Sequence, residues 1–247
     1  MEWVERFYAR QHEWLGVYYL GGVVEQHRDQ AARIARLAGP GPKRVLELGA
    51  GGGQGAAAAA DLGHDVTAIE LLPAAAAHAE ALSAQPRSGT LTVVPGDFYK
   101  VHMNGPFDVA CYWDGFGIGT DVDQRRLLSR VHDWLAPEGC ALIEVITPWY
   151  WSRVTGQEMR FEKAMRRYDF DAEGCRMLDR WWPLDDEGQA VVQSLRCYSP
   201  VDLRLLLEGT GLTLQSLEPG GAVDYETRNY SKQVPLGQAM SYVAKLV

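Results

Sequence analysis

A glycine-rich turn between an apolar strand and an alanine-rich helix is the feature that most restricts how this sequence can fold. Residues 45–48 (VLEL) predict a buried strand, which ends at the glycine-rich residues 49–55 (GAGGGQG). Five consecutive alanines, Ala56 to Ala60, then favour a helix, because alanine loses no side-chain entropy there. Glycine lacks a Cβ and tolerates positive φ, so a turn of this kind lets a ligand approach the backbone at the end of the strand.

Strands and helices continue to alternate up to about residue 150, which is typical of a parallel sheet wound with crossover helices. We expect an alanine-rich helix opened by Pro73 and a second helix over residues 121–135, which ends before residues 137–139 (PEG). The further strands are expected at residues 66–69, 91–94, 107–112 and 141–146. The sequence therefore predicts an α/β fold.

The pattern changes in the last third of the chain, where short β-like pieces are separated by turns and predict a small antiparallel insertion. Ser199 as the cap and Pro200 at the first helical position predict one more helix. The β-like pieces are residues 165–170, 175–182 and 190–198, and the last two strands are expected at residues 212–217 and 240–247.

We expect the whole chain, residues 1–247, to form a single domain. Residues 1–40 predict one or two helices rich in aromatic residues, which would form an N-terminal helical cap. Residues 151–198 would form the antiparallel insertion and act as a lid.

The charge balance excludes several classes of partner. With 24 Lys+Arg against 32 Asp+Glu, the formal net charge is −8, whereas a protein that neutralises nucleic-acid phosphates carries a basic surface. No stretch approaches the roughly 20 apolar residues that span a bilayer, and the start MEWVER lacks the apolar run of a secretion signal. We expect a cytoplasmic protein with neither a nucleic-acid nor a membrane partner.

The spacing of the glycines fits two classes of nucleotide-binding turn. A dinucleotide-binding turn of the form G-x-G-x-x-G, counted from Gly49, puts Gln54 where the third glycine should be, although a shifted frame from Gly51 fits a permissive version. The pattern acid-x-Gly-x-Gly-x-Gly matches at every position with Glu47, Gly49, Gly51 and Gly53.

Two further acids follow neighbouring strands of the predicted sheet. Glu70 ends the second strand, where a carboxylate can accept hydrogen bonds from the two ribose hydroxyls of a nucleoside, and Asp97 follows the third strand. Ligands of open α/β sheets bind outside the carboxyl ends of the strands. We therefore expect Glu47, Glu70 and Asp97 to meet in one crevice.

With these residues the sequence resembles the class I S-adenosylmethionine-dependent methyltransferases, over residues 43–146 and again in the helix at Ser199 and the strand at 241–246. The resemblance implies a doubly wound, seven-stranded, mostly parallel sheet whose last strand is antiparallel. It also implies S-adenosylmethionine as the cofactor and S-adenosylhomocysteine as the product, with no metal.

The same resemblance implies roles for individual residues. The motif with Glu47, Gly49, Ala50, Gly51 and Gly53 would hold the methionine part of the cofactor. Glu70, next to Leu71, would hold the ribose, and Asp97 with Phe98 would contact the adenine. Tyr112, Trp113 and Asp114, after the fourth strand, would lie where the methyl donor meets the acceptor.

Methyl transfer from a sulfonium is an in-line displacement that depends mainly on holding the acceptor close to the methyl carbon. An amine must arrive deprotonated, and a hydroxyl or an acidic carbon needs a base. The candidate bases are Asp114, in the expected crevice, and His12, in the N-terminal cap.

Aromatic residues outside the central strands predict the walls of an acceptor pocket. Such a pocket suits a small aromatic or apolar molecule, methylated on nitrogen, oxygen or carbon by a monomer or a homodimer. The pair Arg166-Arg167 is interpreted as part of a solvated face. The candidate substrate-binding residues are Trp14, Tyr19, Trp113, Trp149 and Trp182.

Two alternatives stay open on the sequence. The shifted glycine frame allows an NAD-dependent oxidoreductase. A methyltransferase-like fold can also serve as a cyclase or a binding module that transfers no methyl group.

Overall fold

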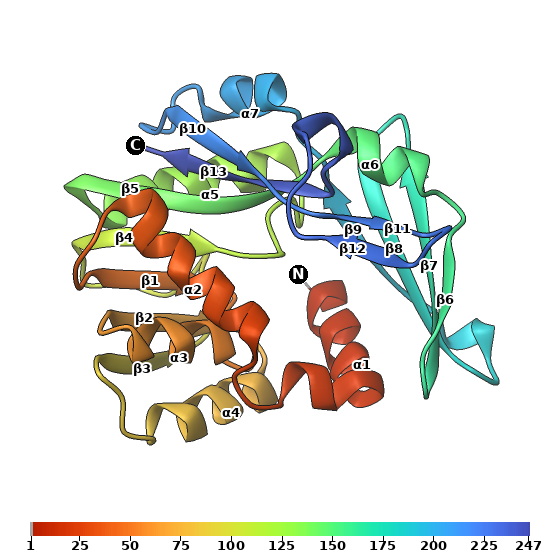
Figure 1. Cartoon of the computed structure of the whole chain (residues 1–247), viewed down its shortest axis with the longest axis horizontal. Helices are drawn as coiled ribbons and strands as arrows, with labels where there is room; N and C mark the ends of the chain where they lie inside the picture. The colour runs from red at the N-terminus through yellow and green to blue at the C-terminus, as the bar shows by residue number, and fades with distance from the viewer. Residues whose placement is uncertain (1) are drawn as a thin grey trace.

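The predicted first strand lies near the middle of a seven-stranded sheet (Figure 1). In this computed structural model, which describes residues 2–247, the strand order is β10-β13-β5-β4-β1-β2-β3. β13 runs antiparallel to both of its neighbours, and the remaining pairs of the sheet are parallel. This confirms the expected fold class. The strands are β1 (Arg44–Leu48), β2 (Asp65–Glu70), β3 (Thr90–Pro95), β4 (Phe107–Tyr112), β5 (Leu135–Ile146), β10 (Leu214–Pro219) and β13 (Ser241–Leu246).

Helices cover both faces of this sheet, as the alternation of side chains along a strand requires. Val45 of β1 packs in one apolar cluster with the five alanines of α3, while Leu46 and Leu48 pack in the other with α5 and α7. The alanines are small and fully buried, so α3 lies close against the strands. The helices are α2 (Glu25–Ala38), α3 (Gln54–Asp61), α4 (Pro73–Ser83), α5 (Asp121–Trp134) and α7 (Pro200–Leu207).

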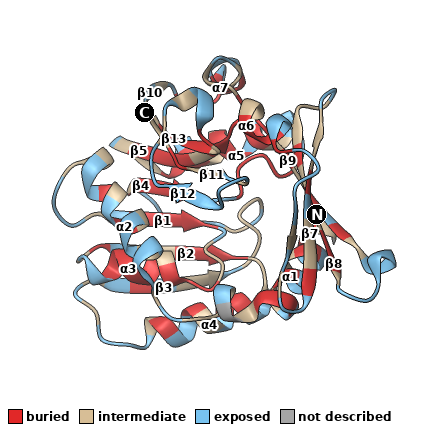
Figure 2. Cartoon of the chain, turned by 45° about the vertical axis from the view of Figure 1, so that its right-hand side comes forward, coloured by how far each residue is buried: buried red, intermediate tan, exposed pale blue. Residues whose placement is uncertain are grey.

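A four-stranded antiparallel sheet stands beside the carboxyl edge of the large sheet, and helix α1 (Glu2–Tyr19) lies between the two sheets (Figures 1 and 2). Three strands of this small sheet were expected from the sequence, and its short edge strand β6 was not. Its strands are β6 (Glu158–Arg160), β7 (Ala164–Asp171), β8 (Arg176–Pro183) and β9 (Val191–Arg196), with the 3₁₀ turn η1 (Glu187–Gln189) before β9.

Three elements differ from the expectation. β5 begins at Leu135, because Leu135 already pairs with Phe107 across a register shift. Helix α6 (Pro148–Arg153) begins at a proline in its first turn, a start signal that the sequence carried. A hairpin of β11 (Ala222–Asp224) and β12 (Asn229–Ser231), followed by the 3₁₀ turn η2 (Leu236–Gln238), precedes β13.

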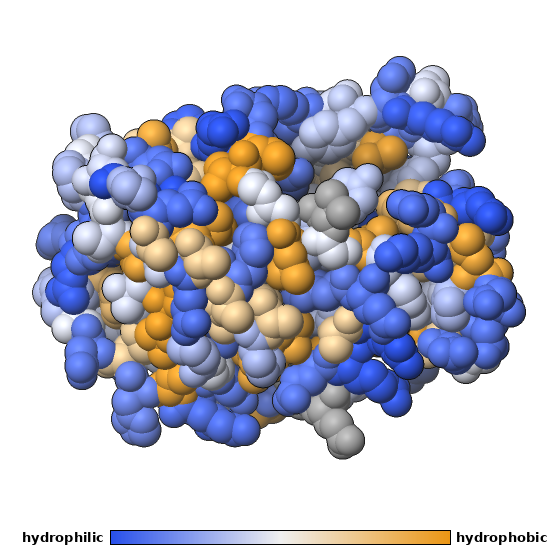
Figure 3. All heavy atoms as spheres, turned by 90° about the horizontal axis from the view of Figure 1, so that it is seen from below, coloured by the Kyte–Doolittle hydropathy of each residue, from blue (hydrophilic) through white to orange (hydrophobic). Residues whose placement is uncertain are grey.

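Hydrophilic residues cover much of the face drawn in Figure 3, with apolar residues among them. Within the described part of the chain, no helix combines the length and the apolar character needed to cross a membrane.

A buried ion pair holds β7 and β8 together at the side of the small sheet that faces the large one. Arg166 donates from Nε and Nη2 to the two carboxylate oxygens of Asp179, each at 2.7 Å. The guanidinium also lies over the rings of Tyr168 and Trp181, at 4.3 Å and 4.8 Å from their centroids.

Removing the acid of this pair should destabilise the protein. Asp179→Ala leaves the guanidinium of Arg166 without its counterion, so we expect the free energy of unfolding, measured in urea, to fall by about 3 kcal/mol. Asp133→Ala, at a carboxylate whose side chain is 77% exposed, is the control and should change stability by less than about 0.5 kcal/mol. Equal stability of Asp179→Ala and the wild type would contradict the structural role of this pair.

Candidate functional site

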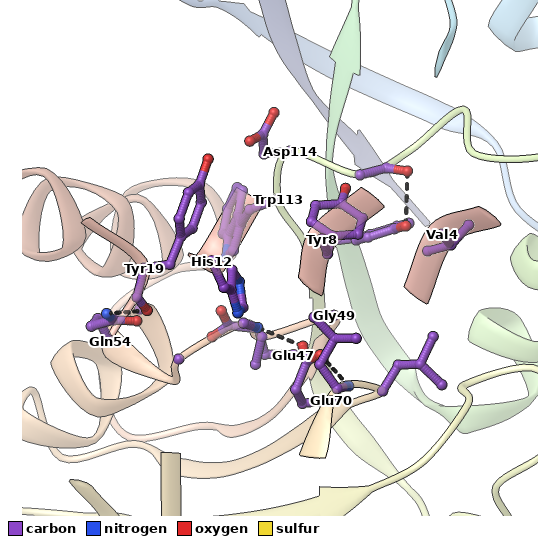
Figure 4. A pocket seen from close by; sticks show the side chains of 18 of the residues that line it. Val4, Tyr8, His12, Tyr19, Glu47, Gly49, Gln54, Glu70, Trp113 and Asp114 are labelled. Carbon is purple, nitrogen blue, oxygen red and sulfur yellow. Dashed lines mark hydrogen bonds between the residues drawn. The ribbon is translucent and has the colours of Figure 1, made fainter. Parts of the chain in front are cut away.

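The loops after β1, β2, β3 and β4 open into one cavity of about 1070 Å³, closed on the other side by α1 and the small sheet. Figure 4 shows Glu47, Glu70 and Asp114 from the strand ends and Tyr8, His12 and Tyr19 from α1 around this cavity. The volume is at the upper end for ligand pockets, which is enough for two small ligands side by side.

The glycines of the turn after β1 have different roles, although Gly49, Gly51 and Gly53 all have positive φ. A Cβ added at Gly51 would meet no atom within 4 Å, so this residue opens directly onto the cavity. A Cβ at Gly53 would lie 2.5 Å from the Cβ of Ala79 on α4. Gly49, Ala50 and Gly51 line the cavity, but Gly53 does not, because it is the point where α4 packs against the turn.

Glu70 ties the loops after β1 and β2 together. Its carboxylate accepts one hydrogen bond from the backbone N–H of Gly51 and another from that of Leu72, both at 2.7 Å. Burial raises the pKa of Glu70, and these backbone donors oppose the rise. Each carboxylate oxygen keeps a lone pair that can accept from a ligand hydroxyl. Leu71, which follows Glu70, also lines the cavity.

Glu47 is a buried carboxylate that makes no hydrogen bond with any residue between 2 and 247. It is 6% exposed, lines the cavity, and burial raises its pKa to about 8. A cationic ligand beside Glu47 would favour its ionised form and lower that pKa. This residue therefore suits a positively charged part of a ligand.

The loop after β3 and the end of β4 supply a polar and an apolar wall. Asp97 accepts a hydrogen bond from the backbone N–H of Tyr99 at 2.8 Å, and Phe98 packs edge-on against Tyr112 with 5.5 Å between ring centroids. Asp97, Phe98 and Tyr112 all line the cavity, next to Gly49, whose added Cβ would lie 3.5 Å from the Tyr112 ring.

Asp114 presents an unpaired carboxylate to the cavity. Its backbone has φ = 50°, an uncommon conformation for a non-glycine residue that aspartate tolerates. The residue is exposed and lines the cavity, and its carboxylate makes no hydrogen bond with the described residues. The protein atoms that surround the carboxylate raise the pKa of Asp114 to about 7; the carboxylates of Glu144 and Asp179 also raise it, and Arg166 lowers it.

Helix α1 contributes one face to the cavity. His12 stacks on Tyr19 with ring centroids 5.0 Å apart, and burial lowers the pKa of His12. The end of the helix is fixed to the glycine-rich turn, because Gln54 Nε2 donates to the carbonyls of Tyr19 at 2.8 Å and Gly21 at 3.2 Å.

Only some of the candidate substrate-binding aromatics reach the cavity. Tyr19 and Trp113 line it, whereas Trp14, Trp149 and Trp182 do not. Trp14 is buried in the apolar cluster between α1 and the small sheet, and Trp149 donates from its indole N–H to the carbonyl of Leu236 at 2.8 Å. Trp182 points to the opposite side of β8 from Trp181, and Trp181 is the residue that lines the cavity.

The cavity residues that were missed from the sequence include Tyr8, Phe161, Arg166 and Trp181. Tyr8 precedes His12 by one helical turn, so helical spacing could have found it. The interpretation of Arg166 as a solvated residue is wrong, because Arg166 pairs with the buried Asp179, whereas Arg167 is exposed.

Comparisons with known proteins agree with this geometry. A family model described as a methyltransferase domain matches residues 24–217. The CcbJ methyltransferase from Streptomyces caelestis has a TM-score of 0.70 at 21% identity, covering 92% of this chain and 90% of that one. No curated protein sequence matches the chain.

Two further solved structures are similar to the chain. An S-adenosylmethionine-dependent methyltransferase from Clostridium acetobutylicum has a TM-score of 0.67 at 14% identity, covering 98% of this chain and 97% of that one. CalS10, an amino pentose methyltransferase from Micromonospora echinaspora, has a TM-score of 0.57 at 20% identity, covering 90% of each chain. At these identities the solved structures show a shared fold.

Gly51 and Gly53 offer a matched pair of substitutions. Gly51→Val should abolish binding of S-adenosylhomocysteine in calorimetry, because its side chain would fill the open space beside the turn. Gly53→Ala should instead lower the free energy of unfolding, by about 1–3 kcal/mol, because its Cβ would overlap Ala79. Unchanged cofactor affinity in Gly51→Val would show that the cofactor does not lie against this turn.

The raised pKa of Glu47 makes stability depend on pH. The folded state holds a proton that the unfolded chain has already released, so stability should fall as pH rises from about 4.5 to about 8. Glu47→Gln cannot ionise, so its melting temperature should fall less than that of the wild type over this range. If the melting temperatures of the two proteins changed by the same amount between pH 4.5 and pH 8, the raised pKa of Glu47 would be contradicted.

Proposed function

The chain belongs to the methyltransferase family whose domain matches residues 24–217, and on that premise we propose that it methylates a small, aromatic or apolar metabolite held beside Asp114. It is a class I S-adenosylmethionine-dependent methyltransferase, with the seven-stranded sheet of that class. Family membership decides between the two glycine frames in favour of acid-x-Gly-x-Gly-x-Gly and against the NAD-dependent oxidoreductase.

The residues at the ends of β1, β2 and β3 fit the cofactor. Gly51 leaves room against the backbone, and Glu47 offers an unpartnered carboxylate for the ammonium of the methionine part. Glu70 can accept from the ribose hydroxyls, and Asp97 with Phe98 lies where the adenine would bind. Bound there, S-adenosylmethionine supplies a methyl group activated by its sulfonium.

Asp114 is the observation that carries the proposal for the acceptor. Its carboxylate faces the cavity at the end of β4, has no partner among the described residues, and has a pKa of about 7. A group with such a pKa can take up a proton at neutral pH, so Asp114 can serve as the general base. His12 lies across the cavity on α1, and its lowered pKa keeps it neutral as a second hydrogen-bonding group.

The remaining walls of the acceptor space are aromatic: Tyr8, Tyr19, Trp113, Phe161 and Trp181. They come from α1, the end of β4 and the small sheet, and they support an acceptor with apolar or aromatic surface. We propose that α1 acts as a cap and the small sheet as a lid, which together hold the acceptor in line with the methyl group and exclude water.

Transfer of labelled methyl from S-adenosylmethionine across a library of small acceptors tests the proposed function. We expect labelled product from at least one aromatic or apolar acceptor. If S-adenosylhomocysteine binds tightly but no acceptor of a broad library is labelled, the chain is instead a binding module or a cyclase on a methyltransferase fold.

Asp114→Asn should separate catalysis from cofactor binding. We expect kcat to fall by about 100-fold or more, because the general base is lost, while the affinity for S-adenosylhomocysteine stays within about twofold. Wild-type kcat should rise with pH through about 7, because the ionised form is the active one, and Asp114→Asn should lose this rise. Asp133→Asn, at an exposed carboxylate, is the control. If Asp114→Asn turned over substrate at the wild-type rate, Asp114 would not be the general base.

A further inference from the structure

The cavity is lined by more acidic than basic side chains. The charged side chains that act on Asp114 are two carboxylates, Glu144 and Asp179, and one guanidinium, that of Arg166. Both oxygens of Asp179 are already bonded to Arg166, so the positive charge of Arg166 is matched before any ligand binds. The carboxylate of Asp114 therefore remains without a counterion among the described residues.

This balance argues against an anionic acceptor. A ligand carboxylate next to Arg166 would share the guanidinium with Asp179 and would lie in the same cavity as Asp114, which repels it. A positively charged group beside Asp114 would instead offset the uncompensated charge and could donate a charge-assisted hydrogen bond to its oxygens.

The aromatic residues next to Asp114 suit the same positive charge. Tyr8 and Tyr19 both lie close enough for Asp114 to raise the pKa of their hydroxyls, after the larger effect of burial, so both rings stay neutral. The faces of such rings attract a desolvated cation within about 6 Å.

We propose that the acceptor atom is the nitrogen of an amine, which enters as an ammonium ion and binds between the carboxylate of Asp114 and the rings of Tyr8 and Tyr19. This inference rests on the proposed function, since it names the class of acceptor for the same site. Under this proposal the two carboxylates without a partner have different roles. Glu47 would face the cofactor, and Asp114 would face the acceptor.

The reaction balances with these groups alone. The ammonium passes one proton to Asp114, which leaves a neutral amine with a free electron pair on nitrogen. That pair forms the new N–CH₃ bond while the C–S bond breaks and its electrons stay on sulfur, giving a thioether and a methylated ammonium. Asp114 accepts a proton from an ammonium, with an ordinary pKa of about 10.4, far more readily than from an alkyl hydroxyl.

Matched pairs of amines and alcohols test the inference by binding, without turnover. The enzyme is saturated with S-adenosylhomocysteine, and calorimetry measures the affinity for 2-phenylethylamine against 2-phenylethanol, and for cyclohexylmethylamine against cyclohexylmethanol. We expect each amine to bind about tenfold more tightly than its alcohol, as a hydrogen bond between charged groups gives. Trimethyl(2-phenylethyl)ammonium has no N–H to donate and cannot be methylated on nitrogen. Its affinity therefore measures how much the aromatic rings contribute to binding of the positive charge.

Asp114→Asn should reduce the amine preference to about twofold or less, while Asp133→Asn should keep it. Unchanged affinity for S-adenosylhomocysteine shows that the Asp114→Asn protein is folded. The inference would be overturned if amines and alcohols bound with equal affinity, or if neither bound. It would also be overturned if Asp114→Asn kept the full preference for amines over alcohols.

The acceptor atom that receives the labelled methyl group distinguishes a failure of this inference from a failure of the proposed function. Methyl transfer to an amine nitrogen supports both. Label on the oxygen of an alcohol or a phenol, or on carbon, would overturn the amine inference and leave the methyltransferase proposal standing. No labelled product from any acceptor would overturn the proposed function itself.

Discussion

Burial of carboxylates at one edge of the large sheet is the constraint on which this site depends. Parallel strands end at the same edge, so Glu47, Glu70 and Asp114 come together although they are far apart in sequence. Taking a carboxylate out of water disfavours its ionised form, so burial raises the pKa of Glu47 and Glu70. The pKa of Asp114, which is exposed to the cavity, is raised by the surrounding protein and by neighbouring carboxylates. Glu70 recovers part of that cost from two backbone donors, whereas Glu47 and Asp114 have no partner among residues 2–247. A cationic cofactor and a cationic acceptor would both complement this edge.

The cavity is closed by segments that are distant in the chain. Gln54, in the first turn of α3, holds the end of α1 over the glycine-rich turn. Near the start of α1, Tyr8 accepts a hydrogen bond from Gln193 of β9 at 2.5 Å. Helix α1 therefore joins the glycine-rich turn to the small sheet, in which Arg166 pairs with Asp179. Helix α1 and the small sheet both line the cavity on this side, which suits the proposed alignment of two ligands away from water.

Much of the fold could be predicted from local patterns. Apolar runs marked the strands of the large sheet, and the Ser199-Pro200 start gave a capped helix with Ser199 accepting from the N–H of Asp202. The start of β5 was misplaced because residues 137–139 look like a break, yet pairing with β4 carries the strand through them. The β11–β12 hairpin and β6 are three residues per strand, too short to show a period of two.

The residues at the ends of β1, β2 and β3 could be predicted from local sequence, because a parallel sheet brings the carboxyl ends of its strands to one edge. Glu47, Gly51, Glu70 and Asp97 reach the cavity for this reason, while Gly53 turned out to pack against Ala79. The residues on the opposite wall of the cavity could not be predicted, because long-range packing selects them. Neighbouring residues of a strand point to opposite sides of the sheet. The packing of the small sheet on α1 selects which side faces the cavity, so Trp181 and Arg166 line it while Trp182 and Arg167 do not. The sequence pattern does not show which member of each pair is on that side.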